Sequence, residues 1–433
     1  MAKDVLRIVF TGHVDHGKST MIGRLLLDTN SLPKEKIAEI KKVSEDLGRD
    51  AELAYITDYL KEERENLITI DTTQIFFKSR RRNYVIIDAP GHVVFIKNMI
   101  SGASQAEAAV LLVDVQEGVM EQTRRHAYLI HMLGIKKIIV VINKMDLINF
   151  REELFNRVKN DINQFYESLS LTTAYTIPIS ARDGVNISKK SPRMKWYKGP
   201  CFLSALDSLR LDGKREMKPL RLPIQDSYTI NNEEIIVGRV ESGRIAKNEQ
   251  VVVLPSLKQT RVRAIKTFGK IRRSAGTGES IGVQIEGNMS IRRGCIIVHK
   301  GDITVPADTF KATIFWMSSG PLHINKKFVI QCSTQEAECS AEKIEKRINS
   351  STLEIIGKDE ERLFENEVGE VFFRTNLPIL IEKFSFIEEL GRFILKDENG
   401  TKAAGIITEI PVKDHPQSRW LFPSQKAFKG IAF

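Results

Sequence analysis

The sequence lacks the features that mark membrane, secreted and disulfide-stabilised proteins. Its 433 residues contain no apolar run that approaches the roughly 20 residues needed to span a bilayer. The cysteines have no close Cys-x-x-Cys spacing, so they indicate neither a zinc site nor a disulfide framework. The N-terminus runs directly into an apolar segment, and we therefore expect no signal peptide. Together these absences predict a cytoplasmic protein whose thiols are reduced and mostly buried: Cys201, Cys295, Cys332 and Cys339.

Repeats and low-complexity tracts are also absent, and the composition is that of a globular protein, with 42% apolar and 28% charged residues. The length predicts two to four domains. The net charge of +10 is compatible with a nucleic-acid partner. We favour a lysine-rich surface instead, because the positive residues are scattered. The densest clusters, Lys78 with Arg80–Arg82 and Lys270 with Arg272–Arg273, occur where hairpin turns are expected.

The first half of the chain alternates predicted strands with predicted helices. The strands are expected at Leu6–Phe10, Thr72–Lys78, Tyr84–Asp88, Ala109–Asp114, Lys137–Asn143 and Ala174–Ile179. The helices are expected at Ser19–Leu27, Lys34–Leu47, Val93–Gly102, Glu121–Leu133, Arg151–Ser168 and Leu203–Arg210. Several strands are continuous apolar runs, which indicates burial on both faces and therefore a mainly parallel sheet between helices. Ligands bind outside the carboxyl ends of such strands.

The second half has short alternating segments with a turn about every ten residues, which predicts all-β barrels or sandwiches. We therefore expect an α/β domain over residues 1–211 and two all-β domains, each a barrel or a sandwich, over 218–302 and 305–411. A tail over 412–433 has no readable period. Within the second β block the expected strands are Thr309–Trp316, Lys327–Gln331, Glu336–Ser351, Glu367–Thr375, Arg392–Lys396 and Ala404–Ile410.

The segment Gly12–Thr20 has the spacing G-x-x-x-x-G-K-[ST] between a predicted strand and a predicted helix, which is the context of a phosphate-binding P-loop. Its glycines let successive backbone N–H groups point at phosphate oxygens. Lys18 is expected to reach the β- and γ-phosphates, and the Ser19 hydroxyl to bind Mg²⁺. The expected nucleotide-binding residues of this loop are Gly12, His13, Val14, Asp15, His16, Gly17, Lys18, Ser19 and Thr20.

The segment Asp88-Ala89-Pro90-Gly91-His92 follows the strand Tyr84–Asp88. In a nucleotide-hydrolysing P-loop protein, an Asp at this place holds Mg²⁺. Gly91 can offer its N–H to the γ-phosphate, since no side chain blocks the approach. His92 lies where an attacking water has to be oriented, so it is the predicted catalytic residue.

The segment Asn143-Lys144-Met145-Asp146 ends another strand and is the predicted base-reading element. The Asp146 carboxylate can accept from the ring N–H and the exocyclic amine of guanine, a pair that adenine does not offer, so GTP is expected rather than ATP. Asn143 is expected to tie this loop to the P-loop, and the Lys144 stem to cover the base. The segment Ser180-Ala181-Arg182 would add a backbone N–H for the guanine carbonyl.

Thr69 precedes the second predicted strand. A threonine at this place can bind both Mg²⁺ and the γ-phosphate, which would make its segment a switch that responds to GTP. The expected metal-binding residues are thus Ser19, Thr69 and Asp88, and the expected cofactors are GTP or GDP and Mg²⁺.

These segments, in this order and with His13, His16 and His92 in these places, resemble the translation-factor-type GTPases, the superfamily of elongation factor Tu. The resemblance covers nearly the whole chain and implies a GTPase domain followed by two β-barrels. It also implies that Val14 and Ile68 form an apolar gate beside His92. The family usually reads Arg-Gly-Ile-Thr where this chain has Asn66-Leu67-Ile68-Thr69.

Within the superfamily, several stretches are similar to the GTPase subunit of bacterial sulfate adenylyltransferase. They are Gly23–Thr29, Gln122–His126, Asn143–Leu147, Trp196–Pro200, Gly238–Gly243 and Asn366–Val371. This resemblance implies a hetero-oligomer with a separate nucleotidyltransferase subunit, in which GTP hydrolysis drives formation of adenosine 5′-phosphosulfate from ATP and sulfate. The chain has no Ser-Gly-Gly-x-Asp-Ser loop, so the adenylyl transfer itself is expected on the partner. His13 and His16 are closer to elongation factors, and Lys195 stands where this branch has proline.

The main hypothesis is therefore a GTPase that serves sulfate activation, without a membrane or nucleic-acid partner. The alternative is a translation-factor GTPase that binds aminoacyl-tRNA or the ribosome, and it is favoured by the positive charge and the P-loop histidines. A GTPase chaperone or regulator of another enzyme is a third possibility. Binding of tRNA that falls steeply with salt would mark the alternative.

Overall fold

The computed structural model describes residues 5–13, 15–32, 35, 38–40, 42, 73–88, 106–169, 171–210, 217–230, 233–267, 270–287, 289, 291–302 and 306–411. The chain divides into two compact units. One consists of Met1–Leu211 with Asn349–Glu354, and the other of Asp212–Ile348 with Ile355–Phe433. The domain limits expected from the sequence stay predictions, and the expected tail 412–433 lies outside the described residues.

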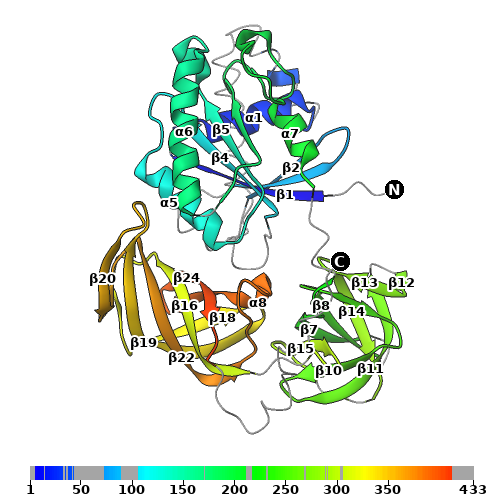
Figure 1. Cartoon of the computed structure of the whole chain (residues 1–433). Helices are drawn as coiled ribbons and strands as arrows, with labels where there is room; N and C mark the ends of the chain where they lie inside the picture. The colour runs from blue at the N-terminus through cyan, green and yellow to red at the C-terminus, as the bar shows by residue number, and fades with distance from the viewer. Residues whose placement is uncertain are drawn as a thin grey trace, which may run out of the picture. The chain divides into compact units, whose positions relative to one another are not determined.

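The first unit is built on a six-stranded sheet with the order β2-β3-β1-β4-β5-β6 (Figure 1). All neighbouring strands run parallel except β2 and β3, so the prediction of a mainly parallel sheet is confirmed. Where both ends lie among the described residues, the predicted ends are correct to within one or two residues. The strands are β1 (Val5–Gly12), β2 (Thr73–Lys78), β3 (Asn83–Asp88), β4 (Ala108–Asp114), β5 (Ile138–Asn143) and β6 (Tyr175–Pro178).

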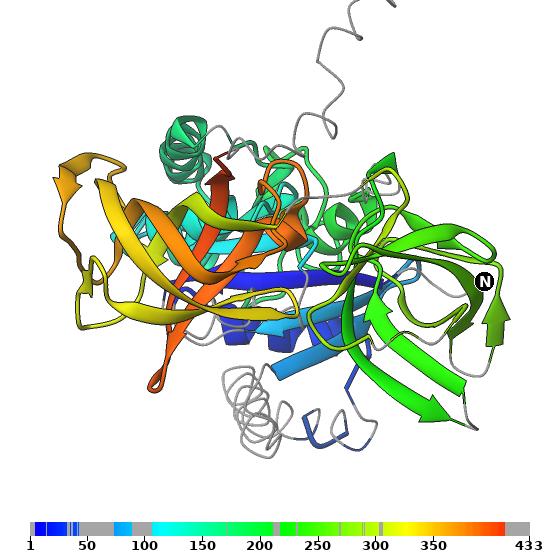
Figure 2. The same cartoon turned by 90° about the horizontal axis from the view of Figure 1, so that it is seen from below.

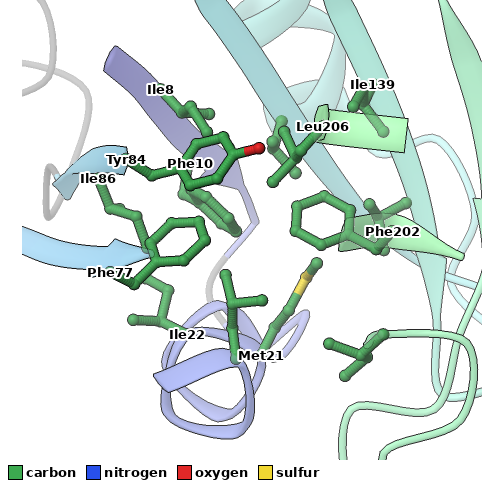
Figure 3. Packing of buried hydrophobic residues seen from close by; sticks show 14 of the residues in the cluster. Ile8, Phe10, Met21, Ile22, Phe77, Tyr84, Ile86, Ile139, Phe202 and Leu206 are labelled. Carbon is green, nitrogen blue, oxygen red and sulfur yellow. The ribbon is translucent and has the colours of Figure 1, made fainter. Parts of the chain in front are cut away.

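Helices cover both faces of this sheet because its central strands are apolar on both sides. On one face, Phe10 of β1 packs with residues of α1 and α7 in a buried cluster (Figure 3). On the other face, α5 contacts β4 and β1, and α6 contacts β5. Val9, Leu111 and Val140, which alternate with the residues of the first cluster, are almost fully buried as well. The helices are α1 (Lys18–Asp28), α5 (Glu121–Met132), α6 (Glu152–Ser168) and α7 (Phe202–Ser208), with 3₁₀ turns η1 (Met145–Ile148) and η2 (Pro192–Met194).

Two predicted helices, Lys34–Leu47 and Val93–Gly102, lie mostly or wholly outside the described residues. The hairpin turn expected at Arg80–Arg82 is confirmed, because the Ser79 N–H donates to the Arg82 carbonyl between β2 and β3. The other basic cluster differs: Lys270 and Arg272 belong to a short strand rather than a turn.

The second unit contains two seven-stranded sheets, each of which closes on itself. The first has the order β10-β15-β7-β8-β14-β11-β12 and is closed by pairing of β10 with β11. The second has the order β18-β23-β24-β16-β22-β19-β20 and is closed by pairing of β18 with β19. Figure 2 shows the first sheet in green and the second in yellow to red. The prediction of two all-β barrels after the α/β part is therefore confirmed.

The strands of the first barrel are β7 (Leu222–Ile230), β8 (Glu233–Arg239), β9 (Arg244–Ala246), β10 (Gln250–Leu254), β11 (Lys258–Thr267), β12 (Lys270–Arg272), β13 (Ser274–Gly276), β14 (Ser280–Ile285) and β15 (Ile296–His299). Those of the second are β16 (Ala307–Trp316), β17 (Leu322–His323), β18 (Lys327–Cys332), β19 (Gln335–Asn349), β20 (Ile355–Glu360), β21 (Arg362–Leu363), β22 (Glu367–Ile379), β23 (Arg392–Asp397) and β24 (Gly400–Glu409), with helix α8 (Glu388–Gly391) before β23. The sequence did not predict β17, β20, β21 or α8.

Each barrel has its own apolar core, and a further cluster joins them inside the second unit. Val252 and Ile296 of the first barrel meet Leu380 and Leu390 beside the second. A buried ion pair accompanies this cluster: the Arg221 guanidinium donates to Glu382 Oε1 over 2.7 Å and also to the Leu220 and Asp302 carbonyls.

Cysteine and membrane predictions can be checked on the described residues. All four cysteines are free thiols, three buried and Cys295 partly buried, as expected. None of the described helices combines the length and the apolar character needed to cross a bilayer.

Candidate functional site

The candidate P-loop follows β1, which lies between β3 and β4 where the strand order reverses. Its two glycines adopt backbone conformations that other residues rarely take, with φ of +148° at Gly12 and +88° at Gly17. Neither position has room for a side chain. A Cβ atom at Gly12 would lie 2.4 Å from the Leu112 carbonyl oxygen, and one at Gly17 would lie 2.4 Å from Asn143 Nδ2. The loop is therefore pressed against β4 and the end of β5.

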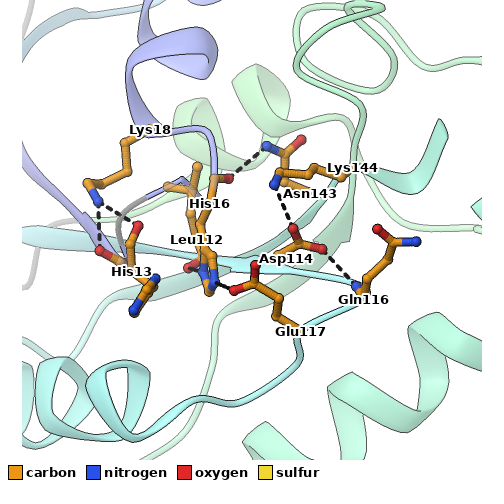
Figure 4. Close-up of polar contacts among 10 residues, drawn as sticks. His13, His16, Lys18, Leu112, Asp114, Gln116, Glu117, Asn143 and Lys144 are labelled. Carbon is orange, nitrogen blue, oxygen red and sulfur yellow. Dashed lines mark hydrogen bonds and ion pairs between the residues drawn. The ribbon is translucent and has the colours of Figure 1, made fainter. Parts of the chain in front are cut away.

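The side chain of Lys18 is held over this loop by hydrogen bonds to backbone carbonyls of the loop. Its ammonium donates to the Gly12 carbonyl over 2.7 Å and to the His13 carbonyl over 2.9 Å (Figure 4). Helix α1, which the structure describes in full, has no side-chain cap and no acidic residue in its first turn. The first N–H groups of a helix and its dipole favour an anion. A cation and a helix N-terminus thus meet at one loop, as phosphate binding requires.

His16 is fully buried below the loop. Its Nδ1 lies 3.2 Å from the Leu112 carbonyl oxygen, and its Nε2 lies 3.0 Å from Glu117 Oε2. Burial lowers the pKa of His16 below its ordinary value, although the contacts with Leu112 and Glu117 act in the opposite direction. His13 lies beside it, with 5.2 Å between the ring centroids.

Asn143 connects three loops of the site. Its side-chain amide donates to the His16 carbonyl over 2.9 Å, and its Oδ1 accepts from the Ala181 N–H over 2.9 Å. Asn143 is 2% exposed, so water does not compete for these bonds. The expected tie between the base loop and the P-loop is therefore present, and the same side chain also fixes the loop Ser180–Arg182.

Lys144 pairs with a buried carboxylate at the end of the neighbouring strand. Its ammonium lies 2.7 Å from Asp114 Oδ2, and the other oxygen of Asp114 accepts from the Gln116 N–H over 2.7 Å. Lys144 has a positive φ of 64° and immediately precedes η1, which contains Asp146. The conformation of the loop after β5 is thus fixed by the left-handed backbone at Lys144 and by the ion pair of the Lys144 side chain with Asp114.

The loop after β6 is anchored to α1 as well. Arg24, which is 8% exposed, donates from Nη2 to the Arg182 carbonyl over 3.1 Å. Within the loop, the Asp183 N–H donates to the Ser180 hydroxyl over 3.1 Å. The three loops after β1, β5 and β6 therefore form one hydrogen-bonded group at the carboxyl edge of the sheet.

The structure brings together much of the site predicted from the sequence. Gly12, His13, His16, Gly17 and Lys18 lie beside Asn143 and Lys144, while Ala181 and Arg182 close the third loop. Asp15, Ser19, Thr20, Asp146 and Ser180 belong to the same loops or to the starts of their helices. The nucleotide-binding roles of these residues stay predictions.

Five predicted residues, Val14, Ile68, Thr69, Gly91 and His92, lie outside the described residues. For Asp88 the structure describes the backbone, which ends β3 and pairs in register with Phe10 of β1. Asp88 therefore ends its strand at the same edge as the P-loop. The metal-binding roles of Ser19, Thr69 and Asp88 and the catalytic role of His92 stay predictions.

Three residues of this region were not singled out from the sequence: Arg24, Asp114 and Glu117. Asp114 had a usable signal, because it ends a buried parallel strand as Asp88 and Asn143 do. Glu117 had none, since its contact with His16 joins residues 101 positions apart. Arg24 sits among apolar residues of a helix, where nothing in the sequence distinguishes it from a solvent-facing residue.

The loop fits the phosphates of a nucleotide. Glycine is needed at two positions of the loop, because Cβ atoms there would clash with Leu112 and Asn143. Lys18 and the first turn of α1 supply positive charge for the phosphates. Ser19 is the second residue of α1, after Lys18, and carries a hydroxyl of the kind that binds Mg²⁺ in P-loops.

The chain is similar to known GTP-binding proteins. The chain matches the model of the elongation factor Tu GTP binding domain over residues 3–226 and that of the GTP-eEF1A C-terminal domain-like family over residues 309–408. It is 39% identical to elongation factor 1-alpha of Pyrococcus furiosus, over 94% of this chain and 98% of that protein. Elongation factor 1-alpha of Thermococcus gammatolerans is 38% identical, over 95% and 99%. A crystal structure of sup35 complexed with GDP has 25% identity, covers 95% of each chain and has a TM-score of 0.45.

These comparisons overturn the sulfate-activation hypothesis. The relatives at 38–39% identity over nearly the full length are named elongation factor 1-alpha, not sulfate adenylyltransferase, so the expected nucleotidyltransferase partner and enzyme complex were wrong. The structure explains why the short stretches misled. Gly23 and Leu25 are buried in the α1 packing, and Trp196 donates its indole N–H to the Phe150 carbonyl and packs on Phe155. Packing within the first unit is enough to account for these residues.

Proposed function

Because the chain belongs to the translation-factor GTPases of the elongation factor Tu superfamily, we propose that it acts in translation as a GTPase that binds aminoacyl-tRNA or the ribosome. The observation that carries the proposal is the extent of the similarity to elongation factor 1-alpha. It covers 94% of this chain and therefore includes both β-barrels as well as the GTPase part. A shared GTPase domain alone would support only nucleotide hydrolysis.

The predicted cofactors, GTP or GDP with Mg²⁺, are those of this family, and the chain is a GTPase. Bound Mg²⁺ supplies charge neutralisation on the β- and γ-phosphate oxygens during phosphoryl transfer. We propose Ser19, Thr69 and Asp88 as the residues that hold it. Lys18 and the P-loop N–H groups stabilise the negative charge of the transferring group, since they are already positioned before the reaction.

In the proposed reaction His92 orients the attacking water, and Thr69 and Gly91 respond to the γ-phosphate. Asp146 reads the guanine edge, Lys144 covers the base, and Ala181 lies in the loop that faces the guanine carbonyl. Asn143 and Asp114 touch the loops rather than the nucleotide in this scheme, so they are positioning residues.

The proposed partner is polyanionic, and the chain's charge of +10 suits it. A factor that works on aminoacyl-tRNA or ribosomes acts in the cytoplasm, so the proposal retains that expected location.

Binding of aminoacyl-tRNA by the full chain tests the proposal. The protein is loaded with a non-hydrolysable GTP analogue or with GDP, and its affinity for aminoacyl-tRNA and uncharged tRNA is measured over a series of salt concentrations. Ribosome binding is measured in parallel by co-sedimentation. We expect the GTP-analogue form to bind aminoacyl-tRNA or ribosomes at least about tenfold more tightly than the GDP form, a difference of about 1.4 kcal/mol. Equal, weak binding of every RNA by both forms would contradict the proposal.

Base specificity tests the GTPase site separately. Asp146→Asn replaces a carboxylate that accepts two hydrogen bonds with an amide that can donate one. Xanthine carries a carbonyl where guanine carries its amine, so the variant is expected to lose GDP and gain xanthosine diphosphate. Asp161→Asn, on the exposed side of α6, removes the same charge and should leave both affinities unchanged. If Asp146→Asn kept its preference for GDP, Asp146 would not read the base.

A further inference from the structure

Two imidazoles and one carboxylate converge beneath the P-loop. The ligand atoms of His13, His16 and Glu117 all lie within 4.8 Å of one another. The P-loop supplies the histidines, and Glu117 comes from the segment between β4 and α5 (Figure 4). Phosphate binding by a P-loop uses backbone N–H groups, the lysine and the hydroxyl that follows it, so it gives these three side chains no task.

With a neutral His16 ring and an ionised Glu117, the contact between these two side chains lacks a hydrogen. The Leu112 carbonyl can only accept, so Nδ1, 3.2 Å away, carries the hydrogen. In the neutral ring Nε2 then presents a lone pair toward Glu117 Oε2, 3.0 Å away, and an ionised carboxylate also only accepts. Two lone pairs therefore face each other beside a ring that is fully buried. A positive ion between them would turn this repulsion into coordination.

The donors suit a transition metal better than Mg²⁺. Imidazole nitrogens bind Zn²⁺ and its neighbours in the first transition row, whereas Mg²⁺ prefers oxygen ligands. Zn²⁺ takes nitrogen ligands at about 2.0–2.1 Å, which places tetrahedral ligand atoms about 3.3 Å apart. The separation of 3.0 Å between His16 and Glu117 is close to this value. His13 is partly exposed, and its ring centroid lies 5.2 Å from that of His16.

The surroundings also have the form of a metal site. A metal-bound histidine usually donates its second ring N–H to a carbonyl or carboxylate, which fixes the tautomer, and His16 does this with Leu112. Glu117 has 43% of its side chain exposed, so an ion can enter from solvent on that side.

We propose that His13, His16 and Glu117 form a three-ligand site for a divalent transition metal of the zinc class, distinct from the Mg²⁺ that accompanies the nucleotide. Water would complete the coordination. The metal would join the P-loop to the segment after β4, where Glu117 is the ligand from outside the loop. The proposal does not depend on a role in translation.

Metal titration of the full, untagged protein tests the site. The protein is treated with a chelator, dialysed, and saturated with GDP and millimolar Mg²⁺, so that the nucleotide's own metal position is filled. Co²⁺ is then added and its visible absorption is recorded, and Zn²⁺ binding is measured by calorimetry. We expect one Co²⁺ per chain with the intense bands of tetrahedral coordination, and displacement of that Co²⁺ by one Zn²⁺.

Glu117→Gln is the decisive variant, with Glu121→Gln as its control. Both remove one exposed acidic charge from the same region, but Glu121 pairs with Arg125 and not with the histidines. Glu117→Gln should weaken Zn²⁺ binding by at least about tenfold and Glu121→Gln should not. His13→Gln should weaken it too, which covers the case in which one variant folds poorly. Absence of a 1:1 complex, or equal binding by all variants, would overturn the proposal and leave His16 and Glu117 as a proton-sharing pair.

Discussion

Lys144 and Asp114 form an ion pair of 2.7 Å at the ends of neighbouring parallel strands, where Asp114 ends β4 and Lys144 directly follows β5. The pair holds a base-loop side chain in place before any nucleotide arrives. The Asp114 side chain is 3% exposed, so its charge is compensated almost entirely by Lys144 and by the Gln116 N–H.

Asp114→Asn should therefore weaken nucleotide binding, although Asp114 does not contact the nucleotide in the proposed scheme. The amide oxygen can still accept from the Gln116 N–H, but Lys144 loses its ionic partner and regains rotamer freedom. Ordering a lysine side chain costs about 1.5–2 kcal/mol, so we expect GDP affinity to fall roughly tenfold. Fluorescence titration with a labelled GDP checks this, with Asp161→Asn as the exposed control. Unchanged affinity would show that Lys144 does not need Asp114.

Asn143→Ala should destabilise the first unit. The change leaves the His16 carbonyl and the Ala181 N–H unpaired in a buried place, at about 1–3 kcal/mol for each group. We expect a lower unfolding temperature of the nucleotide-free protein by calorimetry, and loss of GDP binding as the loops separate. Asn156→Ala, on the exposed side of α6, should have little effect on either measurement. Equal unfolding temperatures for the two variants would contradict this reading of Asn143.

Gly17→Ala separates two reasons for a glycine in the P-loop. Its φ of +88° costs a non-glycine residue about 1–2 kcal/mol. In addition, the new Cβ would lie 2.4 Å from Asn143 Nδ2 and would push that side chain off its partners. Gly118→Ala has a similar φ of +68°, and the nearest atom is 4.0 Å from its Cβ, so it carries only the first cost.

We therefore expect Gly17→Ala to lower the unfolding temperature clearly more than Gly118→Ala, and to lower GDP affinity where Gly118→Ala does not. Similar effects of the two changes would mean that the contact with Asn143 relaxes without cost.

Glu382→Ala should destabilise the second unit through Arg221. The change leaves a guanidinium with only 4% of its side chain exposed and without its counter-ion, and such a break costs about 3–5 kcal/mol. Glu338→Ala removes an exposed partner of Lys327 and should cost about 0–1 kcal/mol. Urea unfolding followed by the fluorescence of Trp316, which lies in the core of the second barrel, compares the two in a background where Trp196 and Trp420 are replaced by phenylalanine. Equal midpoints would show that Arg221 keeps its charge satisfied by the Leu220 and Asp302 carbonyls alone.

Most of the first unit was predictable because its strands are continuous apolar runs and its loops carry motifs. Ile138–Asn143 is buried throughout, and the five β-branched residues before Asn143 are enough to predict a buried strand. β20 is different. Its residues are mostly exposed and show no alternation, and it is a strand because it pairs with β19. Helix α8 has four residues, which is too short for a helical period.

The candidate site was predictable where chemistry depends on local spacing and not where it depends on contacts across the fold. The P-loop and the segment after β5 are contiguous in sequence, so their residue types identify them. The partners of His16 are a backbone carbonyl and Glu117, which the fold brings from β4 and the segment that follows it. The choice of branch within the superfamily failed because it was based on short stretches that contain packing residues, such as Leu25 in the core and the partly buried Trp196.

Asn143 has a consequence for ligands smaller than a whole nucleotide. Its one side chain fastens the phosphate loop through His16 and the base-facing loop through Ala181, so order in either loop favours order in the other. When guanosine and pyrophosphate are added as separate molecules, binding of each should raise the affinity for the other. Thermodynamic linkage requires that the two affinities rise by the same factor. The candidate site is then a cooperative pair of half-sites joined by one amide, and in Asn143→Ala the two fragments would bind independently.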